Sequence, residues 1–359
     1  MSTSKLKWRL LQLERLLAQL RKAWDIKRNS SKQVYVQNRV SEYREIWRAV
    51  AENIGANFVL LTDDLWEMRL NGMRTRILNY KLQFDDPVTL DTVGKKPLVY
   101  RLLSEKGLRV PDHEVFRLDD LDRAAAFLRR HPKGCVVKPA NGTSSGLGVT
   151  THILTRYEVR KAAILASLYD SELLIESMIP GESYRLLVLD RKVIHAVCRR
   201  GPRLVGDGIS SVAELIRAEN ERLTERGEDI LGTDRDCRFT LDYQNLTLSS
   251  IPSMGQGFVV QSVNDSRQRR VEVRTVYNEA VTDLVCDAMK KNAEAAAECL
   301  RSRFIGVDFI TADPTVPLEE SGGAIIEANT TPGLHHHYDL RREKYPEPAL
   351  RVIQTLLHP

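Results

Sequence analysis

The first thirty residues carry leucines at alternating intervals of four and three, at Leu6, Leu10, Leu13, Leu17 and Leu20. This spacing places all five side chains on one face of a helix, because an α-helix turns once in about 3.6 residues. The stripe covers about two heptads, which is short for a coiled coil. We therefore expect a helical arm over residues 1–30 that packs either on the protein's own body or on a second copy.

The pattern beyond residue 30 predicts a mixture of helices and short strands. A second helical pattern runs from Val40 to Val50 and stops near Gly55. Later helices are expected at residues 96–108, after Asp119 or Asp120 as the capping residue, and around residues 281–289. Apolar runs predict strands at residues 58–61 (short and buried), 115–116, 135–138, 149–154, 173–176, 184–189, 304–311 and 324–327. The elements follow no strict βαβ rhythm, which favours α+β lobes over one doubly wound sheet.

Length and composition are those of a folded protein of two or three lobes. The chain has 359 residues, of which 42% are hydrophobic and 28% are charged. It lacks an apolar run of about 18 residues, the length that a membrane-spanning helix needs. Basic residues near the N-terminus interrupt any signal-peptide core, and five widely spaced cysteines form no metal-binding pattern. We therefore expect a cytoplasmic protein with reduced thiols and no membrane span.

Positive charge is concentrated in the N-terminal arm. Residues 1–28 contain eight basic and two acidic residues, whereas the whole chain carries a net charge of +5. Such an arm can meet nucleic acid, anionic lipid or an acidic partner, although a solvated helix face is the commoner explanation. Because the body of the protein has no basic surplus, nucleic acid is not the expected partner.

The first candidate for chemistry is a lysine followed by a flexible loop. Lys138 ends an apolar strand, and residues 142–148 after it contain three glycines and three hydroxyl residues. Backbone N–H groups of such a loop can surround phosphate oxygens, with the lysine charge at its base. The lysine precedes the glycines, so this is not a Walker A loop. The candidate phosphate-binding residues are Lys138, Gly142, Ser144, Ser145, Gly146 and Gly148.

A second candidate segment runs from Glu176 to Gly181. An apolar strand that continues into Glu-x-x-x-Pro-Gly can present backbone amide and carbonyl groups to the edge of a base. A carboxylate nearby can accept hydrogen bonds from an adenine amino group or from ribose hydroxyls. Taken alone, the segment is more simply explained as a strand–turn–strand with surface glutamates.

The most specific signal is a pair of apolar strands with oxygen-bearing side chains. Asp308 lies in one strand, and Glu327 and Asn329 lie in the other. Buried carboxylates need a partner, and oxygen ligands of this kind suit Mg²⁺. The alternative is that these groups cap the ends of the strands. A basic group, Arg185 and residues 199–203, supplies candidate ligands for carboxylate or phosphoryl groups.

These segments occur in the order seen in ATP-grasp ligases. Over about residues 90–340 the chain resembles the ATP-grasp module of cyanophycin synthetase and glutathione synthetase-type ligases, most sharply at residues 179–185, 205–210 and 319–327. The resemblance implies an α+β ATP-grasp fold, in which two lobes hold ATP between them. We expect a basic helical arm at 1–30, a pre-ATP-grasp region at 31–90, and an ATP-grasp domain at 91–350, divided into a small lobe (91–175) and a C-terminal lobe (176–350).

The resemblance also implies roles for individual residues. Lys96, with Lys95 as the neighbouring candidate, and Lys138 match the two lysines that bind the ATP phosphates. Glu176, Met178 and Ile179 match the segment that binds adenine, and Arg185 and Arg200 match arginines near the transferred phosphate. Asp308, Glu327 and Asn329 match the ligands of Mg²⁺, with Mn²⁺ as an alternative. The carboxylate that usually contacts ribose falls near Ser183, so Glu182 is assigned in its place.

The function expected from this resemblance is an ATP- and Mg²⁺-dependent carboxylate–amine ligase. A carboxylate attacks the γ-phosphate of ATP to give an acyl phosphate, and an amine, from an amino acid or peptide, then displaces phosphate to form an amide. The alternatives are a kinase on the same fold and a non-catalytic adaptor that acts through its basic arm. The Mur-ligase-like module of cyanophycin synthetase has no counterpart in this sequence, so cyanophycin is not the expected product.

Three adjacent histidines, His335, His336 and His337, raise the question of a zinc site. Adjacent side chains point in different directions and supply at most one or two ligands together. We therefore expect a role in the substrate pocket or at the surface instead. Their position just after Pro332 and Gly333 places them within reach of the amine site.

Overall fold

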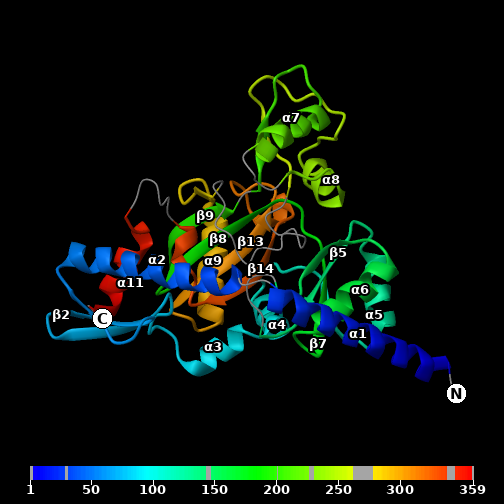
Figure 1. Cartoon of the computed structure of the whole chain (residues 1–359). Helices are drawn as coiled ribbons and strands as arrows, with labels where there is room; N and C mark the ends of the chain where they lie inside the picture. The colour runs from blue at the N-terminus through cyan, green and yellow to red at the C-terminus, as the bar shows by residue number, and fades with distance from the viewer. Residues whose placement is uncertain are drawn as a thin grey trace.

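A five-stranded antiparallel sheet forms the centre of the larger lobe in the computed structural model. The structure describes residues 3–28, 31–142, 147–199, 201–225, 230–261, 278–337 and 344–357. Figure 1 shows this sheet at the middle of the molecule. Its strands lie in the order β12 (Glu279–Ala280), β9 (Lys192–Arg199), β8 (Glu182–Leu189), β13 (Phe304–Thr311) and β14 (Ala324–Thr330).

Successive side chains of β8 point to opposite faces of this sheet, and each face packs against its own apolar core. Leu186 and its even-numbered neighbours face α4 (Lys96–Glu105) and α9 (Asp287–Cys299). Leu187 and Leu189 face the opposite side, where they pack against α2 (Ser31–Ile54), α11 (Glu347–Leu357) and a three-stranded sheet. That sheet consists of β1 (Asn57–Leu60), β2 (Leu65–Leu70) and β3 (Met73–Leu78). Residues 31–84 therefore form a layer over one end of the large sheet.

The smaller lobe is a four-stranded antiparallel sheet with helices on one face. Its strands are β4 (His113–Arg117), β7 (Glu172–Ser177), β5 (Cys135–Pro139) and β6 (Thr150–Ile153), in that order. Helices α5 (Leu121–Arg130) and α6 (Arg156–Ala166) cover it, and α6 begins with a capping box between Thr155 and Glu158. Helix α1 (Thr3–Arg28) lies along α6 (Figure 1) and packs Leu11 and Ala18 against this core.

A peripheral unit with its own small core projects from the large lobe (Figure 1). It contains β10 (Arg203–Val205), α7 (Val212–Glu225), α8 (Arg235–Asp242) and β11 (Gly257–Val259). The remaining elements are α3 (Pro87–Val93), α10 (Leu318–Ser321) and the 3₁₀ helix η1 (Leu334–His336). None of the helices in the described part of the chain is long and apolar enough to span a membrane.

The turn between β7 and β8 joins the two lobes closely. Gly181 has a φ of +126°, and a Cβ atom there would lie 2.1 Å from the carbonyl carbon of Thr311 at the end of β13. Only glycine accommodates both the backbone angle and this contact. The Pro180–Gly181 turn predicted from the sequence therefore also fixes the end of the small-lobe sheet against the large lobe.

Three expectations about local structure were wrong. The helix expected around residues 281–289 begins only at Asp287, because the backbone N–H of Val281 bonds to Ala196 and extends the strand pairing. The strand expected to be buried, β1, is half exposed because it lies at the edge of its sheet. Asp120 is the N-cap residue of α5, but its side chain makes no capping hydrogen bond. The other predicted strands and helices are confirmed.

Substitution of Leu187 tests how the N-terminal layer, residues 31–84, packs on the large sheet. Its side chain is fully buried, whereas Leu60 on β1 is half exposed. We expect Leu187→Ala to lower the free energy of unfolding by about 2–5 kcal/mol and Leu60→Ala by about 0.5 kcal/mol or less. Urea titrations followed by tryptophan fluorescence measure both changes, since Trp47 and Trp66 are buried in this core. Equal effects of the two substitutions would contradict the described packing.

Candidate functional site

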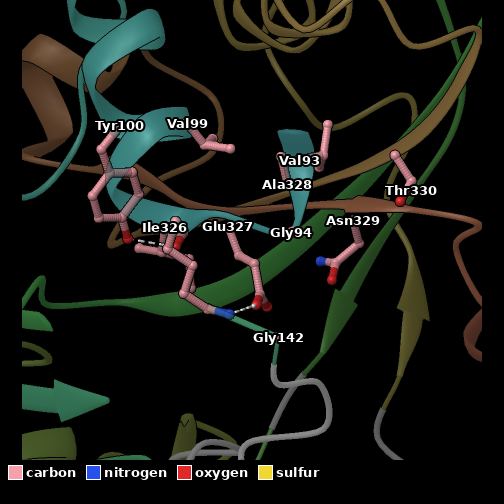
Figure 2. Close-up of a pocket in the computed structure, with 11 residues that line it drawn as sticks. Val93, Gly94, Val99, Tyr100, Gly142, Ile326, Glu327, Ala328, Asn329 and Thr330 are labelled. Carbon is pink, nitrogen blue, oxygen red and sulfur yellow. Dashed lines mark hydrogen bonds and ion pairs between the residues drawn. The ribbon is translucent and has the colours of Figure 1, made fainter. Parts of the chain in front are cut away.

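A pocket of about 220 Å³, open to solvent, lies between the start of α4 and strand β14 (Figure 2). Its walls come from both ends of the domain, since residues near 95 and near 328 face each other across it. The lining residues are Val93, Gly94, Lys96, Val99, Tyr100, Gly142, Ile326, Glu327, Ala328, Asn329 and Thr330. The pocket thus joins the first predicted ATP lysine, one glycine of the loop and two predicted metal ligands.

Pairing between β13 and β14 brings the predicted metal ligands together. Asp308 and Glu327 are direct partners across the two strands, so their side chains lie on the same face of the sheet. Asn329 donates a hydrogen bond from Nδ2 to Oδ2 of Asp308 at 3.2 Å. Two residues apart on the same strand, Glu327 and Asn329 necessarily share a face.

Arg185 holds the Asp308 carboxylate from the neighbouring strand β8. Its Nε and Nη2 atoms donate to Oδ1 and Oδ2 of Asp308, each at 2.6 Å, and both side chains are buried. This two-point geometry fixes the plane of the guanidinium group and the plane of the carboxylate. The sheet thereby places a predicted phosphate ligand directly beside a predicted metal ligand.

Lys96 approaches the same group from α4. Its Nζ lies 3.4 Å from Oε1 of Glu327, and both residues line the pocket. Burial by itself raises the pKa of the Glu327 carboxyl, but the charges of Lys96, Lys138 and Arg185 outweigh burial and lower that pKa below its usual value. Glu327 is therefore an anion in the folded protein. Lys95, the neighbouring candidate, is exposed and begins α4 as its N-cap residue.

Lys138 and Glu176 form a second, buried ion pair on the small-lobe sheet. Their strands β5 and β7 are adjacent, and Nζ of Lys138 lies 2.8 Å from Oε2 of Glu176. The same Nζ donates to the hydroxyl oxygen of Tyr100 at 3.1 Å and lies 3.5 Å from the carbonyl oxygen of Ile326. Because Ile326 precedes Glu327 on β14, the two predicted phosphate lysines approach adjacent residues of one strand.

Asp308, Glu327 and Asn329 together form the acidic group in which the magnesium ion is predicted to bind. Its donors are two carboxylates and one amide oxygen, which are hard ligands of the type that Mg²⁺ prefers. The Asp308 and Glu327 carboxylates are already balanced by Arg185 and Lys96, so a bound cation would share them with these groups. The donor set therefore fits Mg²⁺ in its chemistry. Within the described ranges, no group of three or more His, Cys, Asp or Glu side chains could hold a metal ion.

The predicted adenine segment lies at the junction of the lobes. The backbone N–H of Met178 bonds to the carbonyl of Gly134, and Glu182 begins β8 opposite Thr311. Ile179 lies in the turn between these two positions. This segment is the covalent connection between β7, which carries Glu176, and β8, which carries Arg185, so both predicted binding regions are fixed relative to one another.

The glycine-rich loop after Lys138 is only partly described. Gly142 lines the pocket with a φ of +67°, and Gly148 has a φ of +75°. A Cβ atom at Gly148 would lie 2.8 Å from the Tyr169 ring and 2.9 Å from Pro139, so only glycine fits. The predicted residues Ser144, Ser145 and Gly146, and the predicted arginine Arg200, lie outside the described residues.

The three adjacent histidines are buried, which excludes a surface role. Nδ1 of His337 lies 2.9 Å from Nδ1 of His195 on β9, and Nδ1 of His335 lies 2.7 Å from the Tyr43 hydroxyl on α2. Burial lowers the pKa of His195 to about 4. Burial and the neighbouring His195, His336 and Arg185 also lower the pKa of His337 well below its usual value. Neutral imidazoles therefore line the boundary between the N-terminal layer and Arg185.

No protein-family model matches the chain, but curated relatives do. The glutathione biosynthesis bifunctional protein GshAB of Listeria innocua is 28% identical over 93% of this chain and 46% of its own length. Cyanophycin synthetase of a Nostoc species is 30% identical over 67% of this chain and 26% of its own length. The predicted resemblance to ATP-grasp ligases is confirmed.

The fold is confirmed by a solved structure. A bifunctional glutathione synthetase from Pasteurella multocida superimposes with a TM-score of 0.53 and 22% identity, over 88% of this chain and 43% of that one. The chain therefore has the α+β ATP-grasp fold expected from its sequence. It spans less than half the length of the relatives it matches.

Sequence reasoning missed two groups at this site. Tyr100 lies in the helical segment that begins at Lys96, where a tyrosine on the buried face is indistinguishable from an ordinary core residue. His195 is a single histidine in an apolar strand, and its contact with His337 depends on the pairing of β8 and β9. No local pattern in the sequence signals either contact, because each one joins segments more than 70 residues apart.

The lowered pKa values of His195 and His337 predict how stability depends on pH. The unfolded chain protonates histidine near pH 6.5, but the folded protein does not until about pH 4 at His195. Stability from these groups is therefore fully present above pH 6.5 and is lost as the pH falls toward 4. We expect the free energy of unfolding to fall across this window, by at most about 1.4 kcal/mol per pH unit for each histidine.

Urea titrations at successive pH values measure this dependence. His195→Asn keeps a polar group near the position of Nδ1 and removes one titrating ring, so it should reduce the slope between pH 6.5 and 4.5. Above about pH 8, where an ordinary histidine is neutral in the folded and the unfolded protein, the effect of His195→Asn on the free energy of unfolding should not vary with pH. An unchanged slope in the variant would contradict the buried, neutral state of His195.

Proposed function

We propose that this protein is an ATP- and Mg²⁺-dependent carboxylate–amine ligase that forms an amide or peptide bond through an acyl phosphate. One observation carries the proposal. Lys96 of α4 lines one pocket together with Glu327 and Asn329 of β14. Lys138 of β5 contacts the backbone of Ile326 in the wall of this pocket, and Arg185 of β8 holds Asp308, the strand partner of Glu327. Charges of both signs at this density suit a polyanion that is bound together with a cation.

The chain's own residues would act mainly by position and charge. Lys96 and Lys138 neutralise phosphate oxygens, and Arg185, fixed by Asp308, faces the charge that develops on the transferred group. Arg200 is assigned the same task from the sequence. Asp308, Glu327 and Asn329 would hold Mg²⁺, which polarises the phosphate oxygens when it is bound. Glu176, Met178, Ile179 and Glu182 would contact the nucleoside.

The substrate carboxylate attacks the γ-phosphate of ATP, so that a new P–O bond forms and ADP leaves. The amine then attacks the acyl carbon, phosphate leaves, and the amine proton is released. We place the two substrates on the Arg185 side of the pocket, bordered by His337 and its neighbours. Burial lowers the pKa of His337 well below its usual value, so its neutral imidazole is a weak base and would orient the substrates by hydrogen bonds instead of taking the amine proton.

An ADP-release screen over paired amino acids and peptides tests the proposal. Activity should require a carboxylate and an amine together, with an amide product detected by mass spectrometry, and Lys138→Ala serves as the blank. Phosphate transfer without an amine would instead support a kinase. If the N-terminal arm is deleted and ATP turnover stays unchanged while cellular function is lost, an adaptor role gains support.

Two adjacent lysines provide a matched pair of variants for the same assay. Lys96 lines the pocket beside Glu327, whereas Lys95 is exposed. We expect Lys96→Ala to reduce kcat/KM for ATP roughly 10- to 100-fold, the effect of losing one charge-assisted hydrogen bond, and Lys95→Ala to change it less than about twofold. Equal losses in both variants would contradict the assignment of Lys96.

We further propose that α1 mediates a homodimer. Leu11 and Ala18 pack on the protein's own small lobe, whereas Leu10, Leu13 and Leu17 lie on a different face of the helix and are about half exposed. A helix advances about 100° per residue, so one helix can satisfy both contacts. The two alternatives left open by the sequence, packing on the body and on a second copy, are thus compatible. A leucine stripe is self-complementary and suits a twofold contact.

Matched double substitutions test this dimer by sedimentation equilibrium. Leu13→Glu with Leu17→Glu should convert the dimer to a monomer, because two charges would be buried in the contact. Gln12→Glu with Gln19→Glu adds the same charge elsewhere on α1 and should leave the dimer intact. A wild-type protein that is monomeric at micromolar concentration would rule the proposal out.

A further inference from the structure

Tyr100 lies where three segments of the chain meet. It is only 1% exposed and belongs to α4, whose Val99 and Leu103 are anchored in the core of the large lobe. Its hydroxyl group reaches the Lys138–Glu176 pair of the small lobe and the backbone of β14 at Ile326. Figure 2 shows the Tyr100 side chain directed at Ile326 beside the pocket.

The phenol can make one donated and one accepted hydrogen bond along this junction. Burial, and then the charge of Glu176, raises the pKa of Tyr100 well above its usual value, so the hydroxyl keeps its proton. It accepts from Nζ of Lys138 at 3.1 Å. Its proton is directed either to the carbonyl oxygen of Ile326 at 2.5 Å or to Oε2 of Glu176 at 2.9 Å. Donation to Ile326 ties Lys138 of one lobe to β14 of the other.

We propose that Tyr100 is a positioning residue that holds the Lys138 ammonium group beside β14, where ATP phosphates would bind. Without the hydroxyl, Lys138 keeps its ion pair with Glu176, 2.8 Å away, but loses the shorter of its two contacts on the β14 side, since Ile326 lies 3.5 Å from Nζ. The ring of Tyr100 lies 5.3 Å from Nζ and packs edge-on against His113, so the aromatic contacts do not depend on the hydroxyl. The inference rests on the proposed phosphate-binding role of Lys138.

Tyr100→Phe removes the hydroxyl and keeps the ring. We expect the Kd for MgADP, measured by calorimetry, and the KM for ATP each to rise about tenfold, the effect of about 1.4 kcal/mol for one hydrogen bond to a charged group. The value of kcat at saturating ATP should change less than about twofold, because the contact is the same in the ground state and the transition state. Tyr184→Phe serves as the control, because Tyr184 is a buried tyrosine on the face of β8 opposite to Arg185. It should leave the Kd for MgADP and the KM for ATP unchanged.

A double-substitution cycle separates positioning from a general structural effect. In a Lys138→Ala background, Tyr100→Phe should cause no further loss of MgADP affinity, because the group that it positions is gone. An equal tenfold loss in that background, or no loss in the single Tyr100→Phe variant, would overturn the role of Tyr100 and leave that of Lys138 standing. If Lys138→Ala itself binds MgADP normally, the assignment of Lys138 fails first. Thermal unfolding confirms that each variant is folded during the measurement.

Discussion

The bidentate ion pair between Arg185 and Asp308 is the interaction on which the site depends. A carboxylate buried in the middle of a five-stranded sheet is costly unless it is paired, and removal of one partner from such a pair costs about 3–5 kcal/mol. Strand β8 supplies the partner because Arg185 lies directly opposite Asp308 in the antiparallel register. The register that satisfies the buried charge is also the register that brings Glu327 and Asn329 onto the same face.

The apolar cores make this polar face possible by covering the rest of the sheet. On the face that carries Arg185, the end near Leu187, Leu189 and Phe304 is closed by α2 and α11, and the other end remains available to the pocket. His195 and His337 lie at the boundary between these two regions, where burial lowers the pKa of both below its usual value. The N-terminal layer contacts the adjacent His335 through Tyr43 on α2, whose hydroxyl group lies 2.7 Å from Nδ1 of the imidazole.

Two of the contacts described above join the two lobes. Gly181 fixes the connection between β7 and β8 against the end of β13, and Tyr100 connects the small-lobe ion pair to β14. Within the large lobe, Lys96 adds a charge contact from α4 to Glu327, beside the pocket. A ligand that binds there is therefore in a position to stabilise one relative arrangement of the two lobes.

The sequence by itself determined the fold class, the strand-borne positions of Lys138, Asp308 and Glu327, and the resemblance to ATP-grasp ligases. It could do so because these signals are local: an apolar run, a residue type at a strand end, and a fixed order of short motifs. Only the tertiary structure decided which groups meet, such as Arg185 with Asp308, Tyr100 with Ile326, and His195 with His337. These pairs depend on strand register and on packing between distant segments. A long-range contact does not constrain the types of the neighbouring residues in the chain, so the local sequence pattern cannot predict it.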